Sequence, residues 1–159
     1  MEAASYQLWF AVRYAHVASI ALLTGGAFIV AALSISALPA GPPGERDVAL
    51  AAAVSYEWAF WSVVGVTVAT GVSNLGLKGE GLLGPHTQWG TALTVKLAHI
   101  LLLLALSVVR SNFVVLWRAV TPSGASGRGW TILSVMYGLT CAMFFGAMWI
   151  GLGLAHGRY

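Results

Sequence analysis

Long apolar runs, separated by short segments rich in glycine, proline and charge, divide the chain into predicted helices. The first run ends at Pro39, because proline lacks a backbone donor and blocks a continuing helix. The second follows Asp47, a residue type favoured at helix N-termini. The predicted helices cover residues 7–38, 48–73, 87–119 and 130–155. Each is longer than the roughly 20 residues that cross a hydrocarbon core, so each is predicted to span a membrane.

The connections between these helices predict how they pack. Each connection is roughly ten residues long, which favours antiparallel packing of helices that are neighbours in sequence. We therefore expect one all-α domain, residues 1–159, forming an integral membrane up-down-up-down four-helix bundle.

Composition supports the membrane assignment and excludes several classes of function. The 159 residues are 58% hydrophobic and 8% charged, with a mean hydropathy of +0.82, which is too apolar for a soluble domain of this length. The lipid bilayer is thus the expected environment. The net charge of +3 is spread along the chain without a basic run, so nucleic acid is not an expected partner. A single cysteine, Cys141, excludes an internal disulfide and any multi-cysteine metal site.

The basic residues predict an orientation in the membrane. The side with the first and third connections carries Arg46, Arg110, Arg118 and Arg128, and the other side carries Arg13, Lys78 and Arg158. By the positive-inside rule, the first and third connections are cytoplasmic and both termini lie outside. The expected location is the inner (plasma) membrane of a prokaryote.

Ionisable residues inside two of the spans are the strongest indication of function. Lys96 and His99 lie one helical turn apart in the third run, at a depth where polar groups are costly and usually functional. With a rise of about 1.5 Å per residue, His16 of the first run and His99 both lie roughly 13–18 Å from the same surface. The first and third helices of such a bundle are diagonal, so the two imidazoles are predicted to face one centre.

Two imidazoles on opposite sides of a bundle core match the ligands of a bis-histidine heme b. We expect His16 and His99 to bind the iron, and Arg13 and Lys96, each one turn outward, to pair with the propionates. Four glycines could leave space for a flat ring or allow close helix contacts: Gly25, Gly26, Gly65 and Gly146. The alternative is that each histidine only forms a hydrogen bond between helices.

Two further sets of residues need an explanation. Glu57 and Arg110 lie at comparable depth in the second and third runs, which predicts a buried ion pair, with a proton relay through Glu57 as the alternative. Copper offers an alternative metal, since thioether ligands suit Cu(I). Its candidate ligands are Met136, Met143 and Met148 with His16 and His99. Methionines at this spacing are more often packing residues.

Parts of two helices resemble known membrane families. The segment 87–99, TQWGTALTVKLAH, followed by an apolar run to Arg110-Ser111-Asn112, resembles the signature helix of the CopD-type copper-resistance membrane domain. The segments 13–16 (RYAH) and 24–28 (TGGAF) are similar to the histidine and Gly-Gly-x-Phe helix of that group. They also resemble the HemJ-type protoporphyrinogen oxidases, for which heme b binding is described. The resemblance covers about half of the chain and carries over His16 and Lys96, whereas His99 falls outside the motif.

The sequence therefore predicts a heme-b-binding membrane protein, either an electron-transfer subunit or a small membrane cytochrome. Its expected partners are a quinone or other subunits of a membrane redox complex, and it would be a component of a membrane oxidoreductase without catalytic residues of its own. The resemblance implies two alternatives: a CopD-type copper transport or resistance protein, and a HemJ-like protoporphyrinogen oxidase. A structural subunit is the remaining alternative.

Overall fold

The computed structural model describes residues 2–38, 43–76, 87–120 and 127–156, and these form an all-α membrane bundle. The helices are α1 (Glu2–Ser36), α2 (Pro43–Gly76), α3 (Gln88–Val120) and α4 (Gly127–Ala155). All four are long and apolar enough to cross a membrane, which confirms the predicted fold class.

The helix starts differ from the predicted ones, and local chemistry explains two of them. The second helix begins at Pro43 rather than at residue 48, because proline is favoured where the backbone N–H has no helical partner. Glu45 in its first turn also complements the helix dipole. The side chain of Thr87 caps α3, since its Oγ1 accepts the Gly90 N–H at 2.9 Å.

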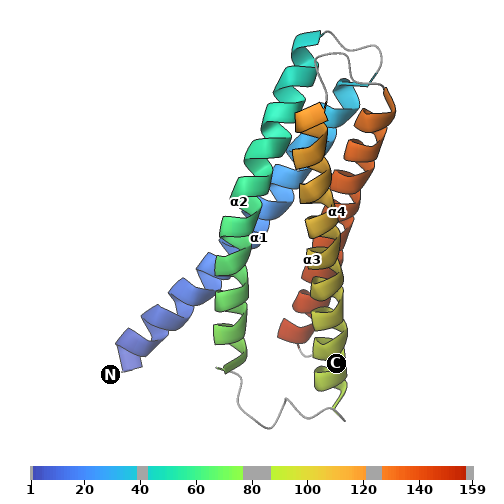
Figure 1. Cartoon of the computed structure of the whole chain (residues 1–159). Helices are drawn as coiled ribbons and strands as arrows, with labels where there is room; N and C mark the ends of the chain where they lie inside the picture. Colours follow the sequence, from blue (N-terminus) through green and yellow to red (C-terminus); the bar gives the residue numbers. More distant parts are fainter. Residues whose placement is uncertain (1, 39–42, 77–86, 121–126, 157–159) are drawn as a thin grey trace.

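The direction of the chain alternates through the bundle, as the colours in Figure 1 show. Helix α1 packs against α2 and α4, and α3 packs mainly against α4, so α1 and α3 lie diagonally opposite each other. Helices α2 and α3 make the least extensive of these contacts and separate toward the end of the bundle where α2 ends and α3 begins (Figure 1). The first turns of α1 leave the bundle altogether, with Tyr6, Phe10 and Tyr14 exposed.

The buried apolar residues form two separate clusters along the bundle. The larger cluster fills the half that contains the end of α1 and the start of α4, and it reaches Leu23, Leu103 and Met143. The smaller cluster, at the opposite end, consists of Trp89, Ala92 and Leu154 with Leu75, Leu93 and Ile150 packed against them. A level without buried apolar side chains lies between the two clusters in the described part of the chain.

Close helix packing in the larger cluster depends on one glycine. A Cβ added at Gly26 would lie 2.8 Å from two ring carbons of Tyr56, closer than real side-chain contacts. The ring cannot easily move away, because the Tyr56 hydroxyl donates to the Leu23 carbonyl at 3.0 Å. Gly26 therefore lets α1 and α2 approach each other, as small residues commonly do between membrane helices.

Candidate functional site

The candidate site is the level between the two apolar clusters, which we call the polar layer. It contains His16 of α1, Thr67, Thr70 and Gly71 of α2, Lys96 and His99 of α3, and Gly146 and Gly151 of α4. On α3 the layer lies between Ala92 of the smaller cluster and Leu103 of the larger one. All four helices thus contribute to a layer of small, basic and hydroxyl-bearing residues inside the spans.

His16 is held against α2 through one ring nitrogen. Its Nδ1 lies 3.0 Å from the Thr67 carbonyl oxygen and 3.1 Å from Thr70 Oγ1. A carbonyl only accepts hydrogen bonds, so Nδ1 carries the proton and Nε2 keeps its lone pair. Gly71 makes this position possible, because a Cβ there would lie 3.2 Å from His16 Cε1.

His99 is held against α4 through its other ring nitrogen, Nε2 rather than Nδ1. Its Nε2 donates to the Met143 carbonyl oxygen at 2.8 Å, so Nδ1 keeps the lone pair. A Cβ at Gly146 would lie 3.1 Å from His99 Cε1 and 3.2 Å from Nε2. The glycine and the carbonyl together fix the position of this ring.

Lys96 points toward α4 without a neutralising partner among the described residues. Its Nζ lies 3.0 Å from where a Cβ on Gly151 would stand, and the side chain is partly buried. Its charge acts electrostatically on His16. The one ion pair within the described ranges joins Glu57 to Arg110 instead. The polar layer is therefore a basic region inside the spans.

Arg13 lies outside this arrangement. It is exposed on α1, and its guanidinium carbon stands 5.1 Å from the centre of the Trp9 ring. Of the four predicted cofactor-binding residues, the structure thus brings Lys96 within electrostatic range of His16 and holds His99 against α4.

The four glycines proposed to make room for a flat ring have two different environments. Gly25 and Gly65 are exposed and face open space, so they lie on the outside of the bundle. At Gly26 and Gly146, the space that a side chain would occupy is taken by the rings of Tyr56 and His99, respectively. These last two serve as close contacts, the alternative that the sequence had left open.

The sulfur-containing residues do not gather in the polar layer. Met143 is buried and Met148 is 43% exposed, so these two lie on different faces of α4. Cys141 is buried with its Sγ 3.9 Å from the Thr24 carbonyl oxygen. Within the described ranges, no three histidine, cysteine or carboxylate side chains are placed to hold one metal ion.

The predicted ion pair between Glu57 and Arg110 is confirmed. Arg110 Nε donates to Glu57 Oε1 at 2.8 Å, and Nη2 donates to Oε2 at 3.3 Å. Arg110 Nη1 donates to Thr140 Oγ1, and the hydroxyls of Ser111 and Tyr137 both donate to the Glu57 carboxylate. The carboxylate and the guanidinium are therefore well satisfied, which indicates a structural role for this pair.

An aromatic cage surrounds the Arg110 guanidinium. Its central carbon lies 4.8–5.2 Å from the ring centres of Tyr56, Phe60 and Tyr137. Sequence reasoning missed these partners. The sequence did hold a signal for Tyr137 and for Thr140, the hydrogen-bond acceptor of Arg110. Their three-residue spacing places both on one face of the helix.

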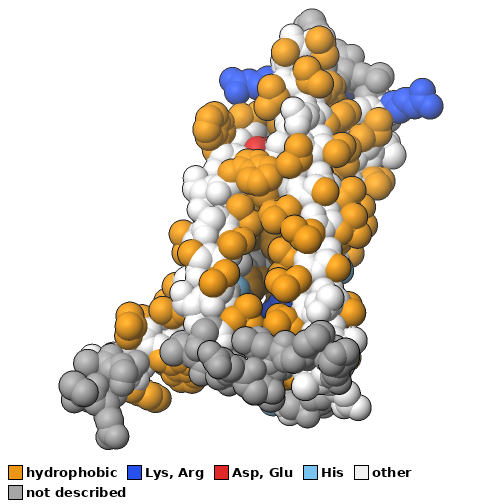
Figure 2. Space-filling view, turned by 60° about the horizontal axis from the view of Figure 1, so that its bottom comes forward, with side chains coloured by type: hydrophobic (Ala, Val, Ile, Leu, Met, Phe, Trp, Pro, Cys, Tyr) orange, Lys and Arg blue, Asp and Glu red, His pale blue; other side chains and the backbone are white. Residues whose placement is uncertain are grey.

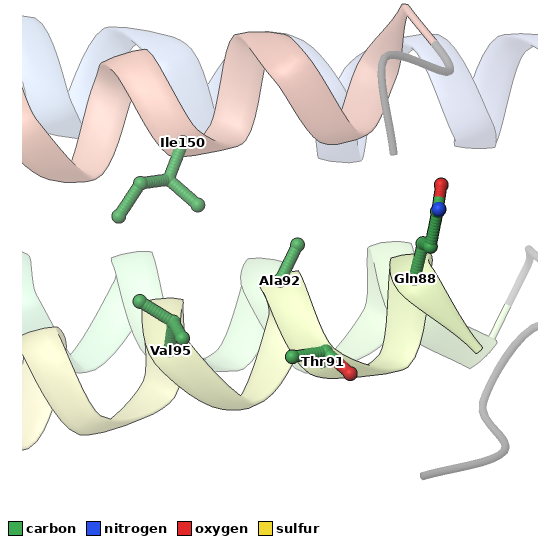
Figure 3. A pocket seen from close by; sticks show the side chains of 5 residues that line it. All are labelled: Gln88, Thr91, Ala92, Val95 and Ile150. Atoms are coloured by element: carbon green, nitrogen blue, oxygen red, sulfur yellow. The ribbon is translucent and has the colours of Figure 1, made fainter. Parts of the chain in front are cut away.

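An open pocket of about 510 Å³ lies beside the start of α3. Figure 3 shows Ile150 of α4 and Ala92 of α3 pointing toward each other across it, with Gln88, Thr91 and Val95 along α3. None of these side chains is titratable, and Val95 is 54% exposed. The pocket is an apolar groove beside the start of α3.

Comparison with family models, with curated proteins and with solved structures found no match. The CopD-type and HemJ-type resemblance therefore stands on the two quoted motifs alone.

Proposed function

We propose that this integral membrane protein binds heme b in the polar layer and passes electrons within the bilayer. The observation that carries the proposal is the state of His16, a residue inside a spanning helix. Its Nδ1–H is committed to the Thr67 carbonyl, which leaves Nε2 as a free metal ligand. A backbone acceptor on the second ring nitrogen is the usual way in which proteins orient a metal-binding histidine.

The two histidines are not equally ready to hold the iron of a heme. His16 can bind iron as it stands. His99 could ligate through Nε2 only after this nitrogen leaves the Met143 carbonyl and its proton moves to Nδ1, because a protonated nitrogen cannot ligate.

Lys96 contributes charge to the same site. Its ammonium can pair with a propionate, and the positive charge favours the reduced, more electron-rich state of a nearby redox centre. Heme, when bound, supplies the one-electron chemistry, and the chain supplies the ligands, the charge and the exclusion of water. A quinone in the bilayer or another subunit of a membrane redox complex would exchange electrons with it.

The test is the absorption spectrum of the purified protein. A Soret band and a sharp reduced alpha band are expected, and His16→Ala should abolish both. His99→Ala should remove the alpha band typical of a six-coordinate, bis-histidine iron. The matched control is His156→Ala. His156 is exposed at the end of α4, and its Nδ1 donates a hydrogen bond to the Leu152 carbonyl one helical turn before it.

Two results would refute the proposal. The first is colourless protein from cells supplied with heme precursor, and the second is His16→Ala protein with an unchanged spectrum. Colourless protein that retains copper in detergent would support the CopD-type alternative. Variants that lose only thermal stability would support a purely structural role.

A second candidate function, oxidation of a porphyrinogen, is favoured by one observation. His16 and Lys96, the two residues that the HemJ-type resemblance carries over, both lie in the polar layer, on α1 and α3. A proton-accepting Nε2 and an ammonium that can bind propionates, both in one layer, suit a tetrapyrrole substrate. Oxidation of added porphyrinogen, lost in both His16→Ala and Lys96→Gln, is the result expected of this function.

A further inference from the structure

The most unusual charge in the bundle is the ammonium of Lys96. Charged residues inside spanning helices are normally paired, and Arg110 of the same helix shows how completely this can be done. Lys96 has no carboxylate or hydrogen-bond acceptor against it among the described residues, although it lies on the same face of the helix. The other acidic side chains described near a helix start, Glu45 and Asp47, belong to the opposite end of the bundle.

The surroundings of Lys96 add no negative charge. His16, the basic residue that α1 contributes to the polar layer, carries no negative charge. On the α4 side stands Gly151, which has no side chain to cover the ammonium. An oxyanion is therefore the chemical group that would satisfy this region, through a charge-assisted hydrogen bond.

The polar layer is also accessible from one side. Figure 2 shows blue basic atoms and pale blue histidine atoms within a hollow between α2 and α3, above the end where α2 finishes. Within the described ranges, the side-chain hydrogen bonds that join these two helices lie at the level of Glu57, Trp61 and Arg110, toward the other end. The walls of the hollow are otherwise apolar (Figure 2), which suits a hydrocarbon chain.

We propose that the polar layer binds the oxyanion head of an amphiphile, a carboxylate or a phosphate, which reaches Lys96 from the lipid between α2 and α3. The apolar tail of the ligand stays in the bilayer beside the two helices, and its head pairs with the ammonium. This proposal stands on Lys96 and the hollow and needs no iron, so it goes beyond the proposed function. A heme propionate would use the same ammonium, so the two ligands would compete.

Native mass spectrometry of the full chain in detergent tests the proposal, because it separates heme-free from heme-bound protein by mass. Oleate and oleyl alcohol share one tail and differ in the charged head. Heme-free protein should retain oleate at least about tenfold better than oleyl alcohol, the size expected of one charge-assisted hydrogen bond. Lys96→Gln should remove this preference, and Lys96→Arg should keep it. The matched control Arg118→Gln removes an exposed cation from the other end of α3 and should leave the preference intact.

The outcomes separate the sources of the ligand and the two proposals. Retention of phosphatidylglycerol with the same dependence on Lys96 would identify a membrane lipid, and retention of oleate alone would identify a free carboxylate. Wild-type protein without a preference for oleate, or Lys96→Gln protein that keeps it, would overturn the inference. If Lys96→Gln does not fold, the comparison of oleate with oleyl alcohol on the wild type decides. Heme absorbance on the same samples tests the proposed function separately.

Discussion

Arg110 and Lys96, two cations on one face of α3, have very different surroundings. Arg110 is 1% exposed and has hydrogen bonds to Glu57 and Thr140 as well as three aromatic rings around it. Lys96 has glycine and imidazole as its neighbours. The planar guanidinium is saturated by a fixed set of side chains, whereas the ammonium has no such set among the described residues.

Removing the Arg110 charge should therefore be strongly destabilising. Arg110→Met leaves the Glu57 carboxylate buried without its counter-ion, and we expect a loss of about 3–5 kcal/mol in the free energy of unfolding. The double variant Glu57→Gln with Arg110→Met should recover part of this loss, since neither charge then remains. Unfolding by a denaturing detergent, followed by circular dichroism, measures both effects.

The control for this experiment is Arg118→Met, because Arg118 is exposed at the end of the same helix. It should change stability by no more than about 0.5 kcal/mol. Equal losses for the Arg110 and Arg118 variants would show that the ion pair does not stabilise the bundle.

At the scale of the helix, glycines decide where side chains of a neighbouring helix can lie. Helix α4 contains Gly138, whose Cβ position has nothing within 4 Å, and Gly146, whose Cβ position is occupied by the His99 ring. The same residue type is thus free at one position and required at the other. The difference arises from which face of α4 meets α3.

Substituting these two glycines by alanine should separate the two roles. Gly146→Ala should displace the His99 ring, weaken its bond to the Met143 carbonyl and destabilise the bundle by about 1–3 kcal/mol, a typical cost of overpacking. Gly138→Ala should be neutral or stabilising by up to about 1 kcal/mol, because alanine is the better helix former. Thermal unfolding in one detergent compares them, and a Gly146→Ala protein as stable as the Gly138→Ala protein would contradict the close contact.

At the scale of the whole molecule, the charges lie unevenly between the two ends of the bundle. The side where α1 and α3 finish carries one more basic residue than the other: Arg46, Arg110, Arg118 and Arg128 against Arg13, Lys78 and Arg158. By the positive-inside rule we expect the end with the extra basic residue to face the cytoplasm. The opening of the hollow between α2 and α3 would then lie nearer the outer surface.

Fusions of reporter domains test this orientation. Alkaline phosphatase joined after Tyr159 should be active and green fluorescent protein at the same position should be dark, because both termini are expected outside. Reporters inserted between residues 121 and 126 should give the reverse pattern. A fluorescent C-terminal fusion would mean that the charge difference does not set the topology.

The number of spans and the ion pair between Glu57 and Arg110 were predictable from the sequence. Four apolar runs of this length are stable when they span a membrane. A carboxylate and a guanidinium at matching depth pair with each other, because the hydrocarbon core does not solvate ions. His16 and Lys96 were found by the same reasoning, since polar groups within apolar runs stand out.

What the tertiary structure decided was how each helix is rotated about its axis. Helices that are apolar all round give no sequence signal for their inner face, because lipid and protein interior are equally apolar. Only packing therefore showed that Gly26 is a contact while its neighbour Gly25 is free, and that His99 donates to Met143 while His16 keeps Nε2 open. The sequence determined which groups enter the membrane, and the three-dimensional packing determined which of them are left without a partner.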